Sequence, residues 1–262
     1  MSSYQTLDVG RDGPVLHIRL NRPDVRNAFN GTLVEELQLA FREADQDEDA
    51  RVVVLSGNGK SFSAGADLSW MQQQAALTPE DNERGAERMA RMFLSIARCR
   101  KPVVGRMHGH ALGGGTGLTA AVDMAFCSED CLFGLTEVKL GIVPAVISPF
   151  VMAKIGRSAA RELFLTGRRF TAQHALDIGL VHTVVAPEAL DATVDGVLRE
   201  VASAGPQAIA AVKSLIADVW NAAPSDAPAL TAAVLAERRA SAEGQEGLRA
   251  FLEKRKPGWS RA

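Results

Sequence analysis

Apolar residues recur with two different periods along the first half of the chain, which predicts strands that alternate with helices. Leu16, Ile18 and Leu20 alternate with His17 and Arg19, as in a strand with one buried face. Continuous short apolar runs bounded by turn residues are instead typical of strands buried on both faces. The predicted strands lie at 14–20, 51–56, 102–107 and 124–127.

Helical spacing of apolar residues fills the segments between these strands. One helix is expected to begin at Thr32, because Glu35 follows at the spacing of a capping box. Others are expected to begin near Pro79 and near Gly114. Strands that alternate with helices in this way indicate an α/β core.

Beyond about residue 144 the pattern becomes mostly helical. The expected helices include 158–165, 171–179, 187–202 and 206–220, with two more toward the end. The Ala-rich segment 231–242 has a face that one small core cannot fully cover, which favours a subunit interface. We therefore divide the chain into a core over residues 1–200 and a helical C-terminal region over residues 201–262.

Composition excludes several classes of partner. The chain has 29 Lys and Arg against 31 Asp and Glu, a formal net charge of -2, so nothing favours binding to nucleic acid or to an anionic membrane surface. Its apolar runs are broken well short of a membrane span, and residues 1–10 lack the pattern of a secretory signal. These observations predict a cytoplasmic protein.

Cysteine and histidine give no sign of a metal site. The three cysteines, Cys99, Cys127 and Cys131, form no disulfide framework and no Cys-x-x-Cys pair. His108 and His110 have no carboxylate or thiol close by in the sequence, so we expect no metal ligand there.

Two glycine-containing segments resemble nucleotide-binding motifs. Gly59-Lys60-Ser61 looks like the end of a phosphate-binding loop, but the earlier glycine that such a loop needs is replaced by Val54. Gly115-x-Gly117-x-x-Ala120 fits one version of the dinucleotide fingerprint, although its distance from the preceding strand is too long for the tight turn. A dinucleotide oxidoreductase stays a minor alternative.

Two other turns are expected to present backbone amides in the same way. The segments 63–68 and 112–116 each follow a buried strand and precede an expected helix, so their free backbone amides would lie at a helix N-terminus. A pair of such amides forms an oxyanion hole, which stabilises negative charge that develops on a carbonyl oxygen. The two turns together therefore indicate chemistry on an acyl group.

In order and spacing, the segments around these turns resemble the crotonase (enoyl-CoA hydratase/isomerase) family. The motifs are LNRP at 20–23, RNAF at 26–29, SFSAGADL at 61–68, GHALGGG at 109–115, FGLTEVKLGIVP at 133–144, LTG at 165–167 and EGLRAFLEKR at 246–255. The resemblance implies a crotonase-like spiral of ββα units with a helical C-terminal trimerisation region, assembled as a homotrimer or homohexamer. It also implies an acyl-CoA thioester as substrate and no separate cofactor, since coenzyme A is part of the substrate.

The resemblance also implies roles for individual residues. The amides of Ala66 and Gly114 would hold the thioester oxygen as it becomes an enolate, and Glu137 would be a catalytic acid–base. The positions that would bind coenzyme A or substrate are Arg26, Ala28, Ala64, Gly65, Ala66, Asp67, Leu68, Gly114 and Lys254. Lys254 matches a family position that in some members reaches coenzyme A across a subunit boundary.

The sequence departs from the family's two-glutamate hydratases at one position. Gly117 stands where the second glutamate is expected, so Glu137 must transfer protons alone. A single glutamate here is also found in the family's enoyl-CoA isomerases, and a non-catalytic acyl-CoA binding protein is a third possibility. This feature alone does not distinguish a hydratase from an isomerase or from a binding protein.

Three further segments resemble bacterial methylglutaconyl-CoA and isohexenylglutaconyl-CoA hydratases, which act in leucine and acyclic-terpene degradation. They are AGADLSWMQ at 64–72, PAVISPFV at 144–151 and EGQEGLRAF at 243–251. The resemblance implies hydration of an α,β-unsaturated acyl-CoA such as 3-methylglutaconyl-CoA. Such a substrate carries a remote carboxylate, for which Arg84, Arg88 and Arg91 are candidate partners.

Overall fold

The main sheet of the protein has six strands. The computed structural model describes residues 3–261, and the strands lie in the order β1-β2-β3-β4-β6-β9. β1 pairs antiparallel with β2, and every later pair is parallel. The bounds are β1 Leu7–Asp12, β2 Val15–Leu20, β3 Val52–Gly57, β4 Val103–Met107, β6 Met124–Ser128 and β9 Thr183–Val185.

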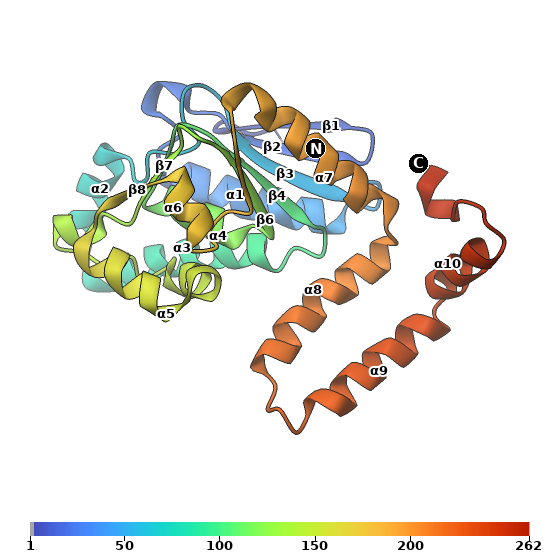
Figure 1. The fold of residues 1–262 in the computed structure, drawn as a ribbon. Coiled ribbons are helices and arrows are strands. Elements are labelled where there is room, and N and C mark those ends of the chain that lie inside the picture. Colours follow the sequence, from blue (N-terminus) through green and yellow to red (C-terminus); the bar gives the residue numbers. More distant parts are fainter. Residues whose placement is uncertain (1–2, 262) are drawn as a thin grey trace.

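Helices cover both faces of this sheet, as Figure 1 shows. α1 (Gly31–Gln46) and α3 (Pro79–Ala97) lie on one face and α7 (Leu190–Ser203) on the other. Successive residues of a strand point to opposite faces, so β3 contributes Val53 and Leu55 to the main core but Val52 and Val54 to the smaller core beneath α7. Burial on both faces explains why the β3 run is apolar without alternation.

A second, smaller sheet contains β5 (His110–Leu112), β7 (Leu132–Gly134) and β8 (Arg169–Thr171), in that order. Two isolated parallel bridges, Ser63 with Ala111 and Phe29 with Ala66, extend it beyond β5. The chain thus passes repeatedly from a strand of the main sheet to the small sheet and then into a helix. β4, β5 and α4 (Gly114–Ala121) form one such unit, and β6, β7 and α5 (Ser148–Thr166) form the next. This succession confirms the predicted spiral of ββα units.

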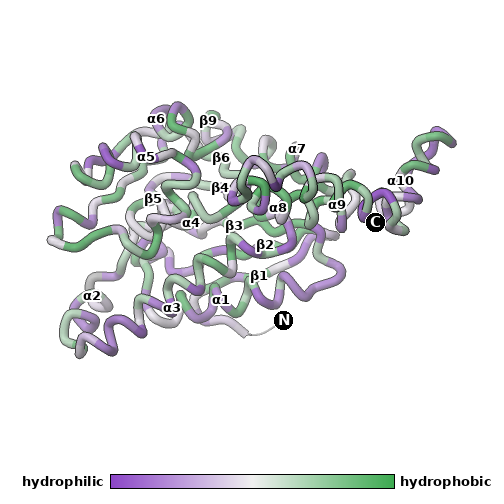
Figure 2. The backbone as a smooth tube through the Cα atoms, turned by 90° about the horizontal axis from the view of Figure 1, so that it is seen from below, coloured by the Kyte–Doolittle hydropathy of each residue, from purple (hydrophilic) through white to green (hydrophobic). Residues whose placement is uncertain are grey.

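The last three α-helices extend away from the sheets (Figure 1). They are α8 (Pro206–Asn221), α9 (Ala227–Ala240) and α10 (Ala242–Leu252). Hydrophobic stretches run along α8 and α9 in Figure 2, and Trp220 and Phe251 are each 81% exposed. The helical character of this region is confirmed, whereas the trimerisation role and the division at residue 200 stay predictions.

Several predicted elements agree with the structure and others do not. The strands expected at 14–20, 51–56, 102–107 and 124–127 correspond to β2, β3, β4 and β6, and α3 begins at Pro79 with Thr78 as its cap. The capping box at Thr32 is wrong, because α1 begins at Gly31 and the Asn30 side chain accepts a hydrogen bond from the Leu33 amide at 2.9 Å.

The helix expected at 158–165 is confirmed as the part of α5 that follows Gly156. α5 starts at Ser148, and a break in helical dihedrals at Gly156 (φ 71°, ψ 169°) separates its first turns from the predicted part. Within residues 3–261, no helix is long and apolar enough to cross a membrane.

Candidate active site

The two glycine-containing turns lie side by side in the structure. The Ser63 amide donates to the His110 carbonyl at 2.8 Å, and the Leu112 amide donates to the Ser63 carbonyl at 2.9 Å. These bonds form a short parallel ladder between segments almost fifty residues apart in sequence. The ladder continues into β5, so the small sheet fixes the position of one turn against the other.

Glycine allows the two backbones to touch. Gly65 has φ 92°, and a β-carbon on it would lie 3.0 Å from the Leu112 carbonyl oxygen. A β-carbon on Gly113, which has φ 50°, would lie 3.8 Å from the Cα of Gly65. Positive φ disfavours a side chain at both positions, and the nearby atoms leave little room for one, so glycine is favoured at each.

The backbone amides of Ala66 and Gly114 have no acceptor within residues 3–261. The Phe29 amide donates to the Gly65 carbonyl at 2.7 Å, and the Asp67 amide donates to the Phe29 carbonyl at 2.9 Å. These bonds pair the groups that flank Ala66, but within residues 3–261 no hydrogen bond engages the amides of Ala66 or Gly114. Gly114 is the first residue of α4, where the helix dipole adds positive potential.

Ala66 and Gly114 line a cavity of about 340 Å³, which we call the site cavity. Its walls are mainly apolar. They include Trp70, Met71, Met89, Val143, Pro144 and Ile147. An apolar pocket with a few polar groups is typical of a small-molecule site, because the polar groups orient the ligand while the walls exclude water.

Glu137 also lines the site cavity, beside the glycine turn. A β-carbon on Gly113 would lie 3.2 Å from its Oε1, while its Oε2 is buried without any hydrogen-bond partner among the described residues. Burial raises the pKa of the Glu137 carboxyl, because the charged form loses hydration. A carboxyl tuned in this way is suited to accept and return a proton.

The backbone around Glu137 is held firmly. The residue begins a 3-10 helix, η2 (Glu137–Leu140), which ends at Gly141 with φ 75°. The Ile142 amide donates to the Glu137 carbonyl at 3.2 Å, which closes this turn. The carboxylate therefore comes from a short rigid turn, not from a long flexible loop.

No second carboxylate accompanies Glu137 among the described residues that line the site cavity. Gly117 lies within α4 and is buried against Ile147, whose Cβ would be 2.9 Å from a β-carbon placed there. The space near Gly117 is therefore occupied by an aliphatic side chain that itself lines the cavity. Glu137 is thus the one carboxylate that these residues bring to the cavity.

Some residues predicted to bind coenzyme A lie at the turns. Ala64 and Gly65 line the site cavity, and the Ala64 amide donates to the Arg26 carbonyl at 2.9 Å. Arg26 itself is exposed and has φ 52°, so its backbone forms part of a tight turn next to the cavity. These positions are brought together as the sequence predicts, although their contacts with a ligand stay a prediction.

Asp67 and Ala28 have structural contacts near the same turn. The Arg22 guanidinium pairs with Asp67 at 2.9 Å and also donates to the Ala28 carbonyl. Hydrogen bonds from Ser69 and from Arg22 lower the pKa of Asp67 to about 2, so this carboxylate stays charged and paired. Leu68 begins α2 (Leu68–Ala75), for which Asp67 is the N-cap.

Lys254 is not near the site cavity in its own chain. It follows α10 with φ 53° and is exposed, and it does not line the cavity. Its predicted contact with coenzyme A would therefore require a second copy of the protein. That contact stays a prediction.

The three arginines predicted to face the acyl group lie elsewhere. Arg84 pairs with Asp81 and Arg91 with Glu87, both on the exposed side of α3, and Arg88 is exposed as well. The structure instead places Arg169 in the wall of the site cavity. Sequence pattern gave no signal for it, because β8 is only three residues long.

The dinucleotide alternative does not fit the structure. Gly115 and Gly117 are buried inside α4, where β-carbons would lie 2.7 Å from the Ser63 carbonyl oxygen and 2.9 Å from the Cβ of Ile147. These glycines serve close packing and leave no room for a pyrophosphate.

His108 and His110 also have structural contacts, with the Gly59 carbonyl and the Ser61 hydroxyl. No metal-binding group of side chains occurs within residues 3–261.

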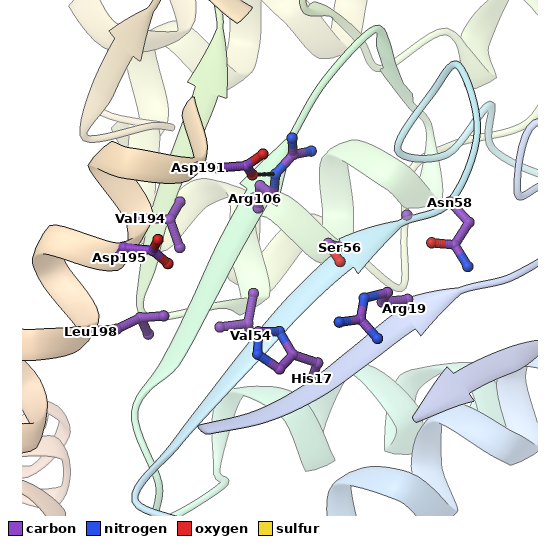
Figure 3. A pocket seen from close by; sticks show the side chains of 11 residues that line it. His17, Arg19, Val54, Ser56, Asn58, Arg106, Asp191, Val194, Asp195 and Leu198 are labelled. Atoms are coloured by element: carbon purple, nitrogen blue, oxygen red, sulfur yellow. Dashed lines mark hydrogen bonds and ion pairs between the residues drawn. The ribbon is translucent and has the colours of Figure 1, made fainter. Parts of the chain in front are cut away.

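A second cavity, of about 260 Å³, lies between the main sheet and α7 (Figure 3). Figure 3 shows Arg106 of β4 and Asp191 of α7 pointing toward each other, joined by an ion pair. His17 and Arg19 of β2 lie across from Asp195. Charged groups of both signs surround this space, so it is a poor receptor for an apolar acyl chain, unlike the site cavity.

Comparison with known proteins agrees with this geometry. Residues 10–262 match the sequence model of the family described as "Enoyl-CoA hydratase/isomerase". The chain is similar to a peroxisomal Delta(3,5)-Delta(2,4)-dienoyl-CoA isomerase of Arabidopsis thaliana, with 35% identity over 82% of this chain and 83% of that protein.

Two solved structures share the fold over nearly the whole chain. An enoyl-CoA hydratase from Shewanella pealeana superposes with a TM-score of 0.94 at 38% identity, covering 97% of this chain and 96% of the other. Pseudomonas aeruginosa AtuE also has a TM-score of 0.94, at 35% identity, covering 98% of this chain and 100% of the other. The chain belongs to the enoyl-CoA hydratase/isomerase (crotonase) family.

Proposed function

We propose that the protein adds water reversibly to the 2,3-double bond of an α,β-unsaturated acyl-CoA, with Glu137 as its only acid–base residue. The observation that carries this proposal is the Glu137 carboxylate, buried beside the free amides of Ala66 and Gly114 in a mainly apolar cavity. These groups are what an oxyanion-stabilised proton transfer requires.

The reaction proceeds through a thioester enolate. Glu137 removes a proton from a water molecule while the oxygen of that water bonds to C3 of the substrate. The electron pair of the 2,3-double bond forms a double bond between C1 and C2, and the carbonyl pair moves to the thioester oxygen, where the Ala66 and Gly114 amides stabilise the negative charge. Glu137 then returns its proton to C2, which restores the carbonyl and completes syn addition of water.

The two amides and the Glu137 carboxylate assist different parts of the reaction. One donor of an oxyanion hole is worth about 3 kcal/mol of transition-state stabilisation, because it acts where water is excluded. Burial raises the pKa of Glu137, so the protonated carboxyl formed in the first step is a weaker acid than usual and the carboxylate a stronger base. Both effects favour a single carboxylate that accepts and returns one proton.

Among substrates of this class we favour 3-methylglutaconyl-CoA or a related branched enoyl-CoA. The support is the resemblance of segments 64–72, 144–151 and 243–251 to hydratases of such compounds. Met71 and Ile147, from the first two of these segments, line the site cavity. The segments that carry the resemblance are therefore in part the ones that would meet the acyl group.

We further propose that coenzyme A is held near Arg26 and residues 64–68, and by Lys254 of a second copy in a homotrimer or hexamer. The apolar residues exposed on α8 and α10, such as Trp220 and Phe251, support assembly, since they are uncovered in the single chain. Coenzyme A belongs to the substrate, and no separate cofactor is needed for the steps above.

Enoyl-CoA isomerisation is the second candidate function. In that reaction Glu137 would remove a proton from C2 of a 3-enoyl thioester and return it to C4, again through an enolate held by the two amides. The absence of another carboxylate among the described cavity residues favours this reaction, because it needs only one proton carrier. The similarity to a dienoyl-CoA isomerase points the same way.

A single experiment separates these activities. Purified full-length protein is incubated in D2O with a panel of 2-enoyl and 3-enoyl thioesters that includes 3-methylglutaconyl-CoA, and products are resolved by mass. A 3-hydroxyacyl-CoA product supports the hydratase. Deuterated double-bond isomers without added water would select the isomerase, and tight binding without turnover of any thioester would indicate a binding protein.

A further inference from the structure

Arg169 is the only cationic residue among the described residues that line the site cavity. It begins β8, at the edge of the small sheet. Within residues 3–261 its guanidinium has neither a hydrogen bond nor an ion pair, whereas the adjacent Arg168 is paired with Glu162 at 2.7 Å and contacts His174. Two neighbouring arginines therefore differ in a way that makes one a natural control for the other.

Packing across the small sheet positions the Arg169 side chain. Leu112 of β5 is in register with Gly134 of β7, which is in register with Arg169 of β8. A β-carbon on Gly134 would lie 3.2 Å from the Cδ2 of Leu112 and 3.3 Å from the Cγ of Arg169. The glycine thus leaves space that the stem of Arg169 fills, on the same face as Leu112.

The charge of Arg169 is not used to neutralise Glu137. The two residues line one cavity, yet no ion pair joins them and Oε2 of Glu137 has no hydrogen-bond partner among the described residues. A guanidinium presents a planar fork of donors that matches carboxylate or phosphate oxygens in a bidentate manner. An unpaired guanidinium at the wall of an apolar cavity is therefore suited to bind a ligand anion.

We propose that Arg169 is the anion-binding residue of the site and contacts an anionic oxygen of the bound acyl-CoA. That oxygen comes from one of two sources, a phosphate of coenzyme A or a carboxylate on the acyl group. The inference rests on the proposed function only in taking the ligand to be an acyl-CoA thioester.

The test measures binding, so that it does not depend on turnover. Four unreactive ligands are compared by calorimetry: butyryl-CoA, glutaryl-CoA and the matching butyryl and glutaryl thioesters of pantetheine, which lack phosphates. The variants are R169Q and the control R168Q, each checked by thermal melting. Because a hydrogen bond to a charged group is worth roughly 1.5–3 kcal/mol, R169Q should weaken the relevant complexes about 10-fold or more.

Two patterns support the proposal and identify the anion. A loss for both coenzyme A thioesters but neither pantetheine thioester assigns the phosphate. A loss confined to the two glutaryl thioesters assigns the acyl carboxylate. In either case R168Q should bind every ligand as the native protein does.

Two other results would overturn the proposal. One is binding by R169Q that matches R168Q for all four ligands, and the other is an equal loss that includes neutral butyryl-pantetheine. If R169Q fails to fold, R169M takes its place, because methionine keeps an unbranched stem against Gly134. Should the native protein bind these ligands but hydrate no enoyl-CoA, the proposed function fails while the role of Arg169 is still decided.

Discussion

A β-carbon on Gly117 would lie 2.9 Å from the Cβ of Ile147 and would overlap its Cγ2 methyl group. The same position is 3.1 Å from Cε1 of Phe93. Ile147 lines the site cavity, so the side chain that leaves no room for a larger residue at position 117 also forms part of the cavity wall. The lack of a side chain at residue 117 and the apolar wall formed by Ile147 thus belong to one packing contact.

We expect this contact to appear in a double-mutant cycle of Gly117→Ala and Ile147→Ala. The first substitution overpacks the core and should cost about 1–3 kcal/mol of unfolding free energy. The second removes a buried side chain and should cost roughly 2–5 kcal/mol. In the double variant the new methyl group occupies vacated space, so the combined loss should fall short of the sum by at least about 0.5 kcal/mol in urea unfolding. Strictly additive losses would contradict the contact.

Removal of the Glu137 carboxylate should abolish turnover without weakening ligand binding. Glu137→Gln keeps the size of the side chain but cannot accept a proton, so kcat should fall by about 100-fold to 10,000-fold. Binding of a saturated acyl-CoA should be unchanged, since the free amides of Ala66 and Gly114 remain. The control is Glu129→Gln, at an exposed glutamate outside the site. Native-like turnover in the Glu137 variant would rule out its catalytic role.

The pH dependence of the reaction should report the environment of Glu137. Its pKa is raised by burial, so the carboxyl becomes protonated, and inactive as a base, at a higher pH than an ordinary glutamate with a pKa of about 4.3. As pH falls, kcat/KM should therefore decline before that ordinary range is reached. The measurement is a profile of kcat/KM on the alkaline and acidic sides of neutrality. A profile that stays flat down to the ordinary glutamate pKa would contradict the shift.

The same group should lower stability as pH rises. The folded state binds the Glu137 proton more tightly than the unfolded state, so the free energy of unfolding decreases as pH increases from the unfolded to the raised folded pKa. Glu137→Gln lacks this titration. Its unfolding free energy should therefore exceed that of the native protein above this window, and the difference should shrink in acid. Denaturant melts of both proteins across the window test the sign, and a difference that grows in acid would refute it.

The sequence predicts those parts of the fold that depend on local pattern. Alternation at Leu16, Ile18 and Leu20 predicts β2, and Thr78 before Pro79 predicts the start of α3. The two turns are visible as runs of small residues between a strand and a helix; such turns are common, and it is their occurrence as a pair that carries the prediction. In each case the signal lies within about ten consecutive residues.

The missing parts depend on contacts between distant segments. β8 has three residues and pairs with β7 more than thirty residues earlier, so its pattern is too short to indicate a strand. Arg169 enters the site cavity through this pairing, whereas Arg84 on α3 has the sequence pattern of a candidate but pairs with Asp81 at the surface. Which arginine reaches the cavity depends on the register of the small sheet, and the hydrophobic pattern of the sequence does not predict that register.

The close approach of the two turns gives a last prediction. Gly65→Ala should reduce both stability and rate, because its φ of 92° disfavours a side chain and its β-carbon would press on the Leu112 carbonyl at 3.0 Å. We expect a loss of roughly 2–3 kcal/mol of unfolding free energy. Displacement of the neighbouring Ala66 amide should lower kcat at least about 10-fold.

Gly13→Ala separates backbone strain from contact in this experiment. Gly13 also has positive φ, 52°, but nothing lies within 4 Å of its β-carbon position, so alanine there should cost only about 1 kcal/mol and leave kcat unchanged. If Gly65→Ala behaved like Gly13→Ala, the turn would not be holding the Ala66 amide in place. A larger loss in kcat for the Gly65 variant alone, measured with the same enoyl-CoA, would tie catalysis to the packing of Gly65 against Leu112.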